Sequence, residues 1–196
     1  MIKAVIYDMD NLMVDSIVTH SRAIDAVLKI YGHSYADVPE ALRAKYVGMR
    51  LVDILKSIID YFKINVKLED LEAKREKIFL EFVRKEMQAM PGLVDSLKFF
   101  KKKGLKIAVG TSGTDKYLDI VLDKFNLRGF FDVVVSGSMV KKGKPDPETY
   151  LVVCRKLNLN PAECVVLEDA FEGVTAAKAA GCKAIARKLQ RNMDTN

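Results

Sequence analysis

Residues 3–16 read KAVIYDMDNLMVDS, in which a short apolar run is followed at once by two aspartates, Asp8 and Asp10. An unbroken apolar run of this length is typical of a strand that is covered on both faces, as in a parallel sheet between helices. Four more runs of this kind follow, at residues 106–111, 132–136, 164–168 and 183–187. We therefore expect five short buried strands.

Helical patterns precede and separate the later strands. They cover residues 92–103, 114–125, 147–157 and 171–180, and the first and last of them end at Gly104 and Gly181, as glycine-capped helices do. Strands that alternate with helices predict an open α/β fold, a Rossmann-like parallel sheet with helices on both faces and right-handed crossovers.

Residues 16–88 interrupt this alternation, because they lack strand runs and carry apolar residues at helical spacing. We therefore expect a helical unit at 16–88, inserted between the first strand and the rest of an α/β domain formed by 1–15 and 89–196.

The composition restricts the class of protein. The 196 residues are 49% hydrophobic and 30% charged, with a net charge of +6, which suits a globular domain with an insertion and an anionic partner. We expect no membrane span, because no run approaches about 18 apolar residues. Three cysteines without CxxC spacing and no apparent leader predict reduced thiols and a cytoplasmic protein. Nucleic-acid binding is not expected, because no basic stripe is interleaved with aromatic residues.

Polar side chains follow four of the predicted strands. Asp8 and Asp10 follow the first, Thr111 and Ser112 the second, Lys144 lies beyond the third, and Glu168 and Asp169 end the fourth. In an open α/β sheet, ligands bind outside the carboxyl ends of the strands. We therefore expect these side chains to meet at one edge of the sheet.

Such a set of side chains suits phosphoryl chemistry. The four carboxylates offer the hard oxygen ligands that Mg²⁺ prefers, and Thr111 and Lys144 can donate to phosphate oxygens. An aspartate can also act as a covalent nucleophile. Each feature alone is common and has a structural explanation, but all four in this order indicate a catalytic site.

These stretches resemble the motifs of the haloacid dehalogenase superfamily, in its phosphatase and phosphomutase branch, over nearly the whole chain. The similar stretches are Asp8-Met9-Asp10 with Asp15-Ser16, Thr111, Gly143-Lys144-Pro145-Asp146-Pro147, and Leu167-Glu168-Asp169 with Gly173-Val174 and Ala179-Ala180-Gly181. One position departs from the family pattern: Asn11 stands where glycine is usual. Asparagine tolerates left-handed backbone better than most residues, so we expect the turn to survive.

The resemblance implies the roles of the core residues. Asp8 would be the nucleophile that forms an aspartyl-phosphate, and Asp10 would be acid and then base. Mg²⁺ would be held by Asp8, Asp169 and the backbone carbonyl of Asp10, with Glu168 acting directly or through water. Thr111, Lys144 and the backbone amide of Ser112 would bind the phosphoryl group, with the amides of Met9 and Asp10.

The resemblance also implies that residues 16–88 form a mobile cap that closes over the site and reads the leaving group. Its candidate substrate residues are His20, Lys45 and Arg50, the last of which follows Gly48 closely. Each also has an ordinary interpretation as a surface or helix-start residue.

We therefore expect a Mg²⁺-dependent phosphatase that hydrolyses a small phosphorylated metabolite, such as a sugar phosphate or a phosphoglycolate-like compound, as a monomer or weak homodimer. The superfamily's dehalogenases lack the second aspartate, and an alkoxide leaving group, unlike a halide, needs a proton. The main alternative is a β-phosphoglucomutase-like isomerase that uses the same aspartyl-phosphate. A non-catalytic binding protein on the same fold is a further alternative, against which the complete set of site residues argues.

Overall fold

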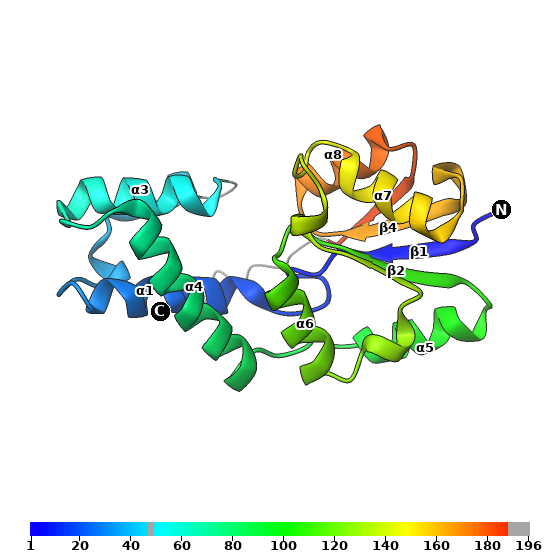
Figure 1. The fold of residues 1–196 in the computed structure, drawn as a ribbon, viewed down its shortest axis with the longest axis horizontal. Helices are drawn as coiled ribbons and strands as arrows, with labels where there is room; N and C mark the ends of the chain where they lie inside the picture. Colours follow the sequence, from blue (N-terminus) through cyan, green and yellow to red (C-terminus); the bar gives the residue numbers. More distant parts are fainter. Residues whose placement is uncertain (47–48, 188–196) are drawn as a thin grey trace. The chain divides into compact units, whose positions relative to one another are not determined.

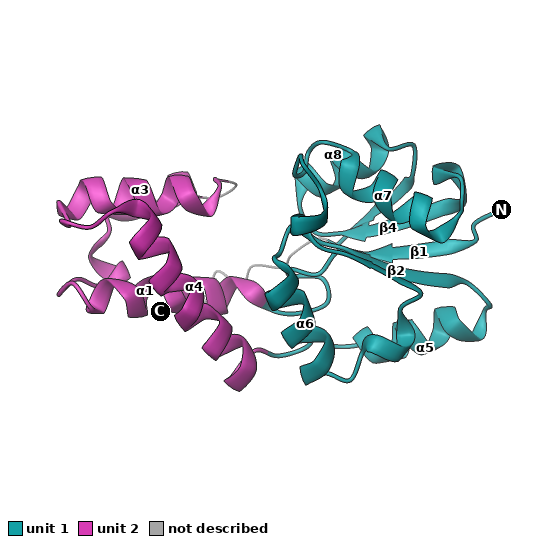
Figure 2. Cartoon of the chain, viewed as in Figure 1, with its two compact units in different colours: residues 1–15, 88–196 teal, residues 16–87 magenta. Residues whose placement is uncertain are grey.

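A parallel sheet organises the larger of the two units into which the chain divides (Figures 1 and 2). The computed structural model describes residues 1–46 and 49–187. Within them, the sheet has the order β3-β2-β1-β4-β5. Its strands are β1 (Ala4–Tyr7), β2 (Lys106–Gly110), β3 (Val133–Val135), β4 (Cys164–Glu168) and β5 (Lys183–Ala186). All neighbouring strands pair in parallel, so the predicted α/β fold is confirmed.

The central strand β1 fixes where the functional loops lie. Strand β2 pairs with one side of β1 and β4 with the other. The chain therefore reverses the direction in which it adds strands beside β1. In the register of the sheet, Tyr7 lies level with Val109 of β2 and Leu167 of β4. Asp8 therefore leaves the sheet between Gly110 and Glu168, at the place where open α/β sheets bind ligands.

Four α-helices of this unit pack around the sheet: α5 (Leu93–Lys102), α6 (Asp115–Lys124), α7 (Glu148–Leu157) and α8 (Phe171–Ala179). Figure 1 shows α7 and α8 on one side of the strands and α5 and α6 on the other. All four residues of β1 are buried, because helices cover both faces of the centre of the sheet. Short 3-10 helices lie in the connections, at Arg128–Phe130, Gly137–Met139 and Pro161–Glu163.

The last strand differs from the prediction of five buried strands. Lys183, Ile185 and Ala186 of β5 are exposed in the structure, and Ile185 is 59% exposed. The physical reason is the position of β5 at the edge of the sheet, which an apolar run by itself does not reveal.

The second unit, Ser16–Met87, is helical. Its described helices are α1 (Ser16–Lys29), α2 (Glu40–Arg43), α3 (Leu51–Phe62) and α4 (Leu68–Lys85), with 3-10 turns at Tyr35–Asp37 and Ala44–Tyr46. The apolar faces of α1, α3 and α4 form its core, which includes Val27, Leu28, Leu55, Ile58 and Leu71. The unit thus has a hydrophobic core of its own, separate from that of the α/β unit.

The three cysteines are free and buried. The Cys154 Sγ lies 3.6 Å from the Cys164 Sγ and 3.7 Å from the Cys182 Sγ, and all three residues belong to the apolar core of the α/β unit. In such surroundings cysteine packs as a small hydrophobic residue. Among the described helices, none has both the length and the apolar character that crossing a membrane requires.

Candidate active site

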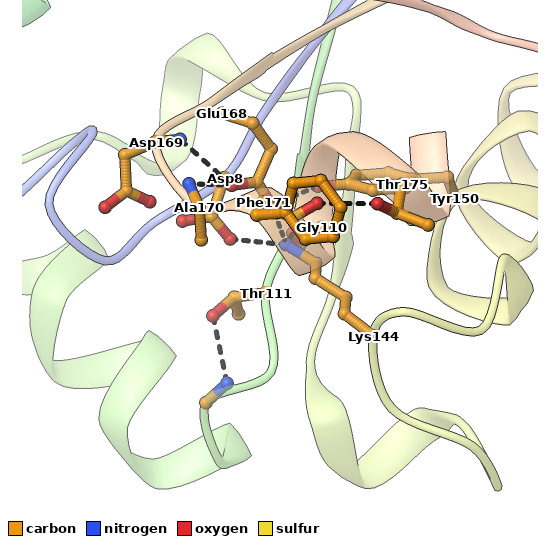
Figure 3. Close-up of polar contacts among 11 residues, drawn as sticks. Asp8, Gly110, Thr111, Lys144, Tyr150, Glu168, Asp169, Ala170, Phe171 and Thr175 are labelled. Carbon is orange, nitrogen blue, oxygen red and sulfur yellow. Dashed lines mark hydrogen bonds and ion pairs between the residues drawn. The ribbon is translucent and has the colours of Figure 1, made fainter. Parts of the chain in front are cut away.

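Lys144 connects the ends of β1, β2 and β4 (Figure 3). Its Nζ donates to Asp8 Oδ1 at 2.6 Å, to Glu168 Oε1 at 2.6 Å and to the carbonyl oxygen of Gly110 at 3.2 Å. These three acceptors match the three protons of an ammonium group. The loop that carries Lys144 is thereby fixed to the carboxyl edge of the sheet.

The Lys144 ammonium is almost completely buried, with 8% of its side chain exposed. Burial alone would lower its pKa, but the neighbouring carboxylates Asp8 and Glu168 outweigh burial and raise the pKa. The ammonium also stands 4.8 Å from the centre of the Tyr150 ring, a favourable cation–π geometry. Lys144 therefore remains charged inside the site.

Asp8 lies in an environment that disfavours its carboxylate form. Burial, followed by repulsion from Glu168 and Asp10, raises its pKa to about 8, although the attraction of Lys144 opposes these effects. Among the described residues, four carboxyl groups, of Asp8, Asp10, Glu168 and Asp169, gather at this edge of the sheet around the ammonium group of Lys144. A further cation at this place would stabilise the charged form of Asp8.

Both carboxylate oxygens of Glu168 accept hydrogen bonds. Its Oε1 accepts from Lys144 and from the Tyr150 hydroxyl at 2.7 Å, and its Oε2 accepts from the backbone N–H groups of Asp169 and Ala170. A Cβ atom on Gly173 would collide with this carboxylate. The glycine in the first turn of α8 therefore allows Glu168 to lie against the start of that helix.

Three carboxylates form a possible metal centre. One oxygen each from Asp8, Glu168 and Asp169 lie within 4.8 Å of one another. The pKa of Asp169 is raised by burial and then by Glu168, while a hydrogen bond from the Asn11 side chain opposes the rise. Crowded carboxylates of this kind fit a divalent cation that prefers oxygen ligands.

The loop after β1 places Asp10 and Asn11 at the same edge. The hydroxyl of Tyr117, from the first turn of α6, donates to Asp10 Oδ1 at 2.8 Å. Asn11 has a left-handed backbone, with φ of 53°, and its carbonyl accepts from Arg187 at 2.7 Å. The turn thus forms with asparagine in place of the usual glycine, as the sequence predicted.

Thr111 and Ser112 follow β2. Thr111 is fully buried, and its Oγ1 accepts from the backbone N–H of Gly113 at 2.9 Å, which keeps the hydroxyl proton available as a donor. Thr111 directly follows Gly110, whose carbonyl oxygen accepts from Lys144. Ser112 is exposed, so its backbone rather than a buried side chain is the group suited to binding.

The family model described as haloacid dehalogenase-like hydrolase matches residues 5–187. The chain belongs to this family. A phosphorylated carbohydrates phosphatase of Thermotoga maritima is 34% identical over 93% of this chain and 83% of its own length. Fructose-1-phosphate phosphatase YqaB of Escherichia coli is 31% identical over 94% of this chain and 95% of its own length.

Solved structures of this hydrolase family share the fold. A provisionally named beta-phosphoglucomutase of Thermotoga maritima matches with a TM-score of 0.83 at 32% identity, covering 98% of this chain and 89% of its own. CbbY of Rhodobacter sphaeroides, solved in complex with xylulose-(1,5)bisphosphate, matches with a TM-score of 0.80 at 25% identity, over 95% of this chain and 86% of its own. The resemblance stated from the sequence motifs is therefore confirmed.

The remaining candidates for this hydrolase lie in the helical unit. His20, on α1, stacks on Phe79 of α4 with ring centres 4.3 Å apart, and its Nδ1 pairs with Arg75. Arg50 precedes α3, where its guanidinium is exposed and pairs with Asp53 at 2.7 Å. Arg50 thus lies at the start of α3 in an exposed pair, which matches one of the two interpretations that the sequence left open.

Lys45 is exposed in the 3-10 turn Ala44–Tyr46, and Gly48 lies outside the described residues. Among the described residues of the second unit, no built substrate site surrounds Lys45. The part of Lys45 and Gly48 in binding stays a prediction.

The sequence did not indicate a role for two buried residues with polar groups, Arg75 and Tyr117. Arg75 is only 2% exposed and stands over the Phe79 ring at 4.5 Å. It occupies the same face of α4 as the buried Leu71 and Phe79, so an arginine in an apolar helical stripe was the available signal. Tyr117 carried no such signal, because tyrosine fits an apolar helix face.

Proposed function

We propose that this protein is a Mg²⁺-dependent phosphatase that hydrolyses a small phosphorylated sugar or similar metabolite through an aspartyl-phosphate at Asp8. The observation that carries the proposal is the buried Asp8 at the end of β1, paired with Lys144 and two residues before a second carboxylate, Asp10. Family membership and the names of the relatives support the same class of reaction.

In the first half of the reaction, Asp8 attacks phosphorus and the bond from phosphorus to the leaving oxygen breaks. The Asp10 carboxyl donates its proton to that oxygen, so a neutral alcohol departs. The ammonium proton that now faces Asp8 turns to a phosphoryl oxygen, because the phosphorylated Asp8 no longer carries a carboxylate charge. The Thr111 hydroxyl and the backbone N–H of Ser112 complete the binding of the phosphoryl group.

In the second half, a water molecule attacks the phosphorus of the aspartyl-phosphate. The Asp10 carboxylate accepts a proton from that water, and Asp8 leaves as a carboxylate. Phosphate is released, and the enzyme returns to its starting protonation state. The two halves need opposite proton movements at Asp10, so one carboxyl group serves both.

Asp8, Asp169 and Glu168, with the backbone carbonyl of Asp10, would hold the divalent cation. When bound, Mg²⁺ supplies positive charge that offsets the crowded carboxylates and the negative charge of the phosphoryl group. The carboxylate spacing of the site and the raised pKa values of Asp8 and Asp169 support this assignment.

We assign residues 16–88 the role of a cap that shields the aspartyl-phosphate and selects the leaving group, with His20, Lys45 and Arg50 as candidate substrate residues. Support comes from the separate hydrophobic core of this unit and its two connections to the α/β unit. A cap of this kind excludes bulk water from the active site and gives the enzyme its specificity for the leaving group.

A mutase is the second candidate, because one of the similar structures is provisionally named a beta-phosphoglucomutase. A mutase must hold a bisphosphate intermediate in two orientations and exclude water throughout. The exposed Arg50 and Lys45 do not form a built site for a second phosphate within the described part of the helical unit. We therefore favour net hydrolysis.

The test is to incubate the protein with aryl phosphate, fructose 1-phosphate, hexitol phosphates and phosphoglycolate, with Mg²⁺ and with a chelator. Phosphate release that requires Mg²⁺ and is lost in Asp8→Asn is the expected result. A parallel incubation contains β-glucose 1-phosphate and a trace of glucose 1,6-bisphosphate. Glucose 6-phosphate that forms much faster than free phosphate would replace the phosphatase assignment by the mutase.

A further inference from the structure

We propose that Tyr117 is a positioning residue for Asp10, which fixes Oδ1 as a hydrogen-bond acceptor and assigns the transferable proton to Oδ2. This inference rests on the proposed function, in which Asp10 is the acid and base. Its basis is the hydrogen bond of 2.8 Å from the Tyr117 hydroxyl to Asp10 Oδ1, which joins two residues of the α/β unit far apart in sequence.

The position of the Tyr117 ring is determined by its packing. Only 4% of Tyr117 is exposed, and its backbone N–H is bound by the Thr114 side chain that caps α6. A Cβ atom on Gly113 would lie 2.8 Å from Tyr117 Cδ1 and 3.1 Å from Met9 Cε. The missing side chain at Gly113 therefore gives the ring room against the loop after β2 and directs its hydroxyl to Asp10.

The single hydroxyl proton of Tyr117 determines what Asp10 can do. A phenol has one proton to donate, and here it points to Oδ1. If the carboxyl proton were on Oδ1, the Tyr117 hydroxyl could no longer donate to that oxygen and would need another acceptor for its own proton, whereas a proton on Oδ2 preserves the observed bond. Keeping this hydrogen bond therefore favours the proton on Oδ2.

The same arrangement serves both halves of the reaction. With its proton on Oδ2, Asp10 can protonate the leaving oxygen, and as a carboxylate it can take a proton from water on the same oxygen. Tyr117 does not touch the reacting atoms in this account. It keeps the carboxyl group in one rotational state, so that the proton is presented in one direction.

The experiment compares wild type with Tyr117→Phe on a series of aryl phosphates, from dinitrophenyl phosphate to phenyl phosphate, and on a sugar phosphate. For the dinitrophenyl ester, which needs no acid, kcat/KM should stay within about twofold of wild type. For phenyl phosphate and the sugar phosphate it should fall about tenfold or more, since general acid catalysis contributes 10²–10⁴-fold. If Tyr117 had only a structural role, its replacement would lower kcat/KM equally for all of these substrates.

The matched control is Tyr7→Phe. It also removes a buried tyrosine hydroxyl from the same unit, one that bonds Ser96 at 2.9 Å. This variant should show the same dependence on the leaving group as wild type. Equal dependence in wild type, Tyr7→Phe and Tyr117→Phe would overturn the inference.

A second variant keeps the test decisive if Tyr117→Phe does not fold. Gly113→Ala retains the hydroxyl but should displace the ring, because the added methyl group meets Tyr117 Cδ1. It should reproduce the selective loss on poor leaving groups, and an unchanged profile would contradict the inference. If wild type hydrolyses no phosphate ester with Mg²⁺, the proposed function fails and this inference with it. An active wild type with an unselective loss in both variants refutes the role of Tyr117 alone.

Discussion

Replacing Lys144 by methionine tests whether one buried ammonium compensates the carboxylates around it. Methionine keeps most of the length of the side chain but removes the charge, the two ion pairs of 2.6 Å and the contact with the Tyr150 ring. Breaking a buried ion pair by removing one partner typically costs about 3–5 kcal/mol. We expect a loss of about 3 kcal/mol or more in the free energy of unfolding of the metal-free protein at pH 7.

The loss should increase at alkaline pH. The pKa of Asp8 is raised to about 8 with Lys144 present, so above pH 8 wild type pairs an Asp8 carboxylate with the ammonium. In Lys144→Met the Asp8 carboxylate has no ammonium partner, so Asp8 keeps its proton to a higher pH. Above pH 8 this costs the variant about 1.4 kcal/mol of folding free energy for each further pH unit. The destabilisation should therefore be larger at pH 9 than at pH 6.

The assay is urea denaturation followed by circular dichroism in a chelating buffer, with hydrogen exchange of Ala4–Tyr7 to assign the transition to the sheet. Lys3→Met is the control, because Lys3 pairs with Glu163 at 2.7 Å but is 57% exposed. Exposed pairs contribute at most about 1 kcal/mol. If Lys144→Met stayed within about 1 kcal/mol of wild type at both pH values, the ammonium would not be compensating the site.

Three further predictions concern the same edge of the sheet. Asp169→Ala should raise the Mg²⁺ concentration for half-maximal activity more than the KM for substrate, and an unchanged metal dependence would contradict its role as ligand. Gly173→Ala should destabilise the α/β unit by about 2 kcal/mol or more in thermal or urea unfolding, because its methyl group collides with Glu168, and a neutral effect would contradict the packing. The metal-free protein should lose stability as pH rises from about 4 to about 8, since the folded state of Asp8 binds its proton more tightly than the unfolded state with a pKa of 3.8. Asp8→Asn should flatten that slope, and an equal slope in this variant would assign the effect elsewhere.

The sequence predicted the sheet edge well because the chemistry lies where strands end. Asp8, Lys144 and Glu168 come from three separate segments, and the parallel arrangement brings their side chains within hydrogen-bond distance. The order of apolar runs along the sequence is therefore enough to predict that these three side chains lie close together. The turn at Asn11 was also predictable from the sequence, because a left-handed backbone depends on the local sterics of the residue itself.

Other features depend on tertiary packing that no short pattern contains. The exposure of Ile185 follows from the position of β5 at the edge of the sheet, which the apolar run does not specify. Tyr117 lies on the apolar stripe of α6 that packs inward, but its hydroxyl reaches Asp10 only because Gly113 makes room for its ring. The stripe predicts that Tyr117 is buried, and not what its hydroxyl contacts.

The most direct test of the central claim is to detect the aspartyl-phosphate itself. Asp10→Asn should still transfer the phosphoryl group from dinitrophenyl phosphate, a substrate with a good leaving group, but should hydrolyse the product slowly. The protein is mixed with this substrate and Mg²⁺, quenched, treated with borohydride to reduce the acyl phosphate, and its peptides are analysed by mass spectrometry. We predict homoserine at position 8 and at no other aspartate, and none in the double variant with Asp8→Asn. Turnover without modification at Asp8, or modification at another carboxylate, would contradict the account.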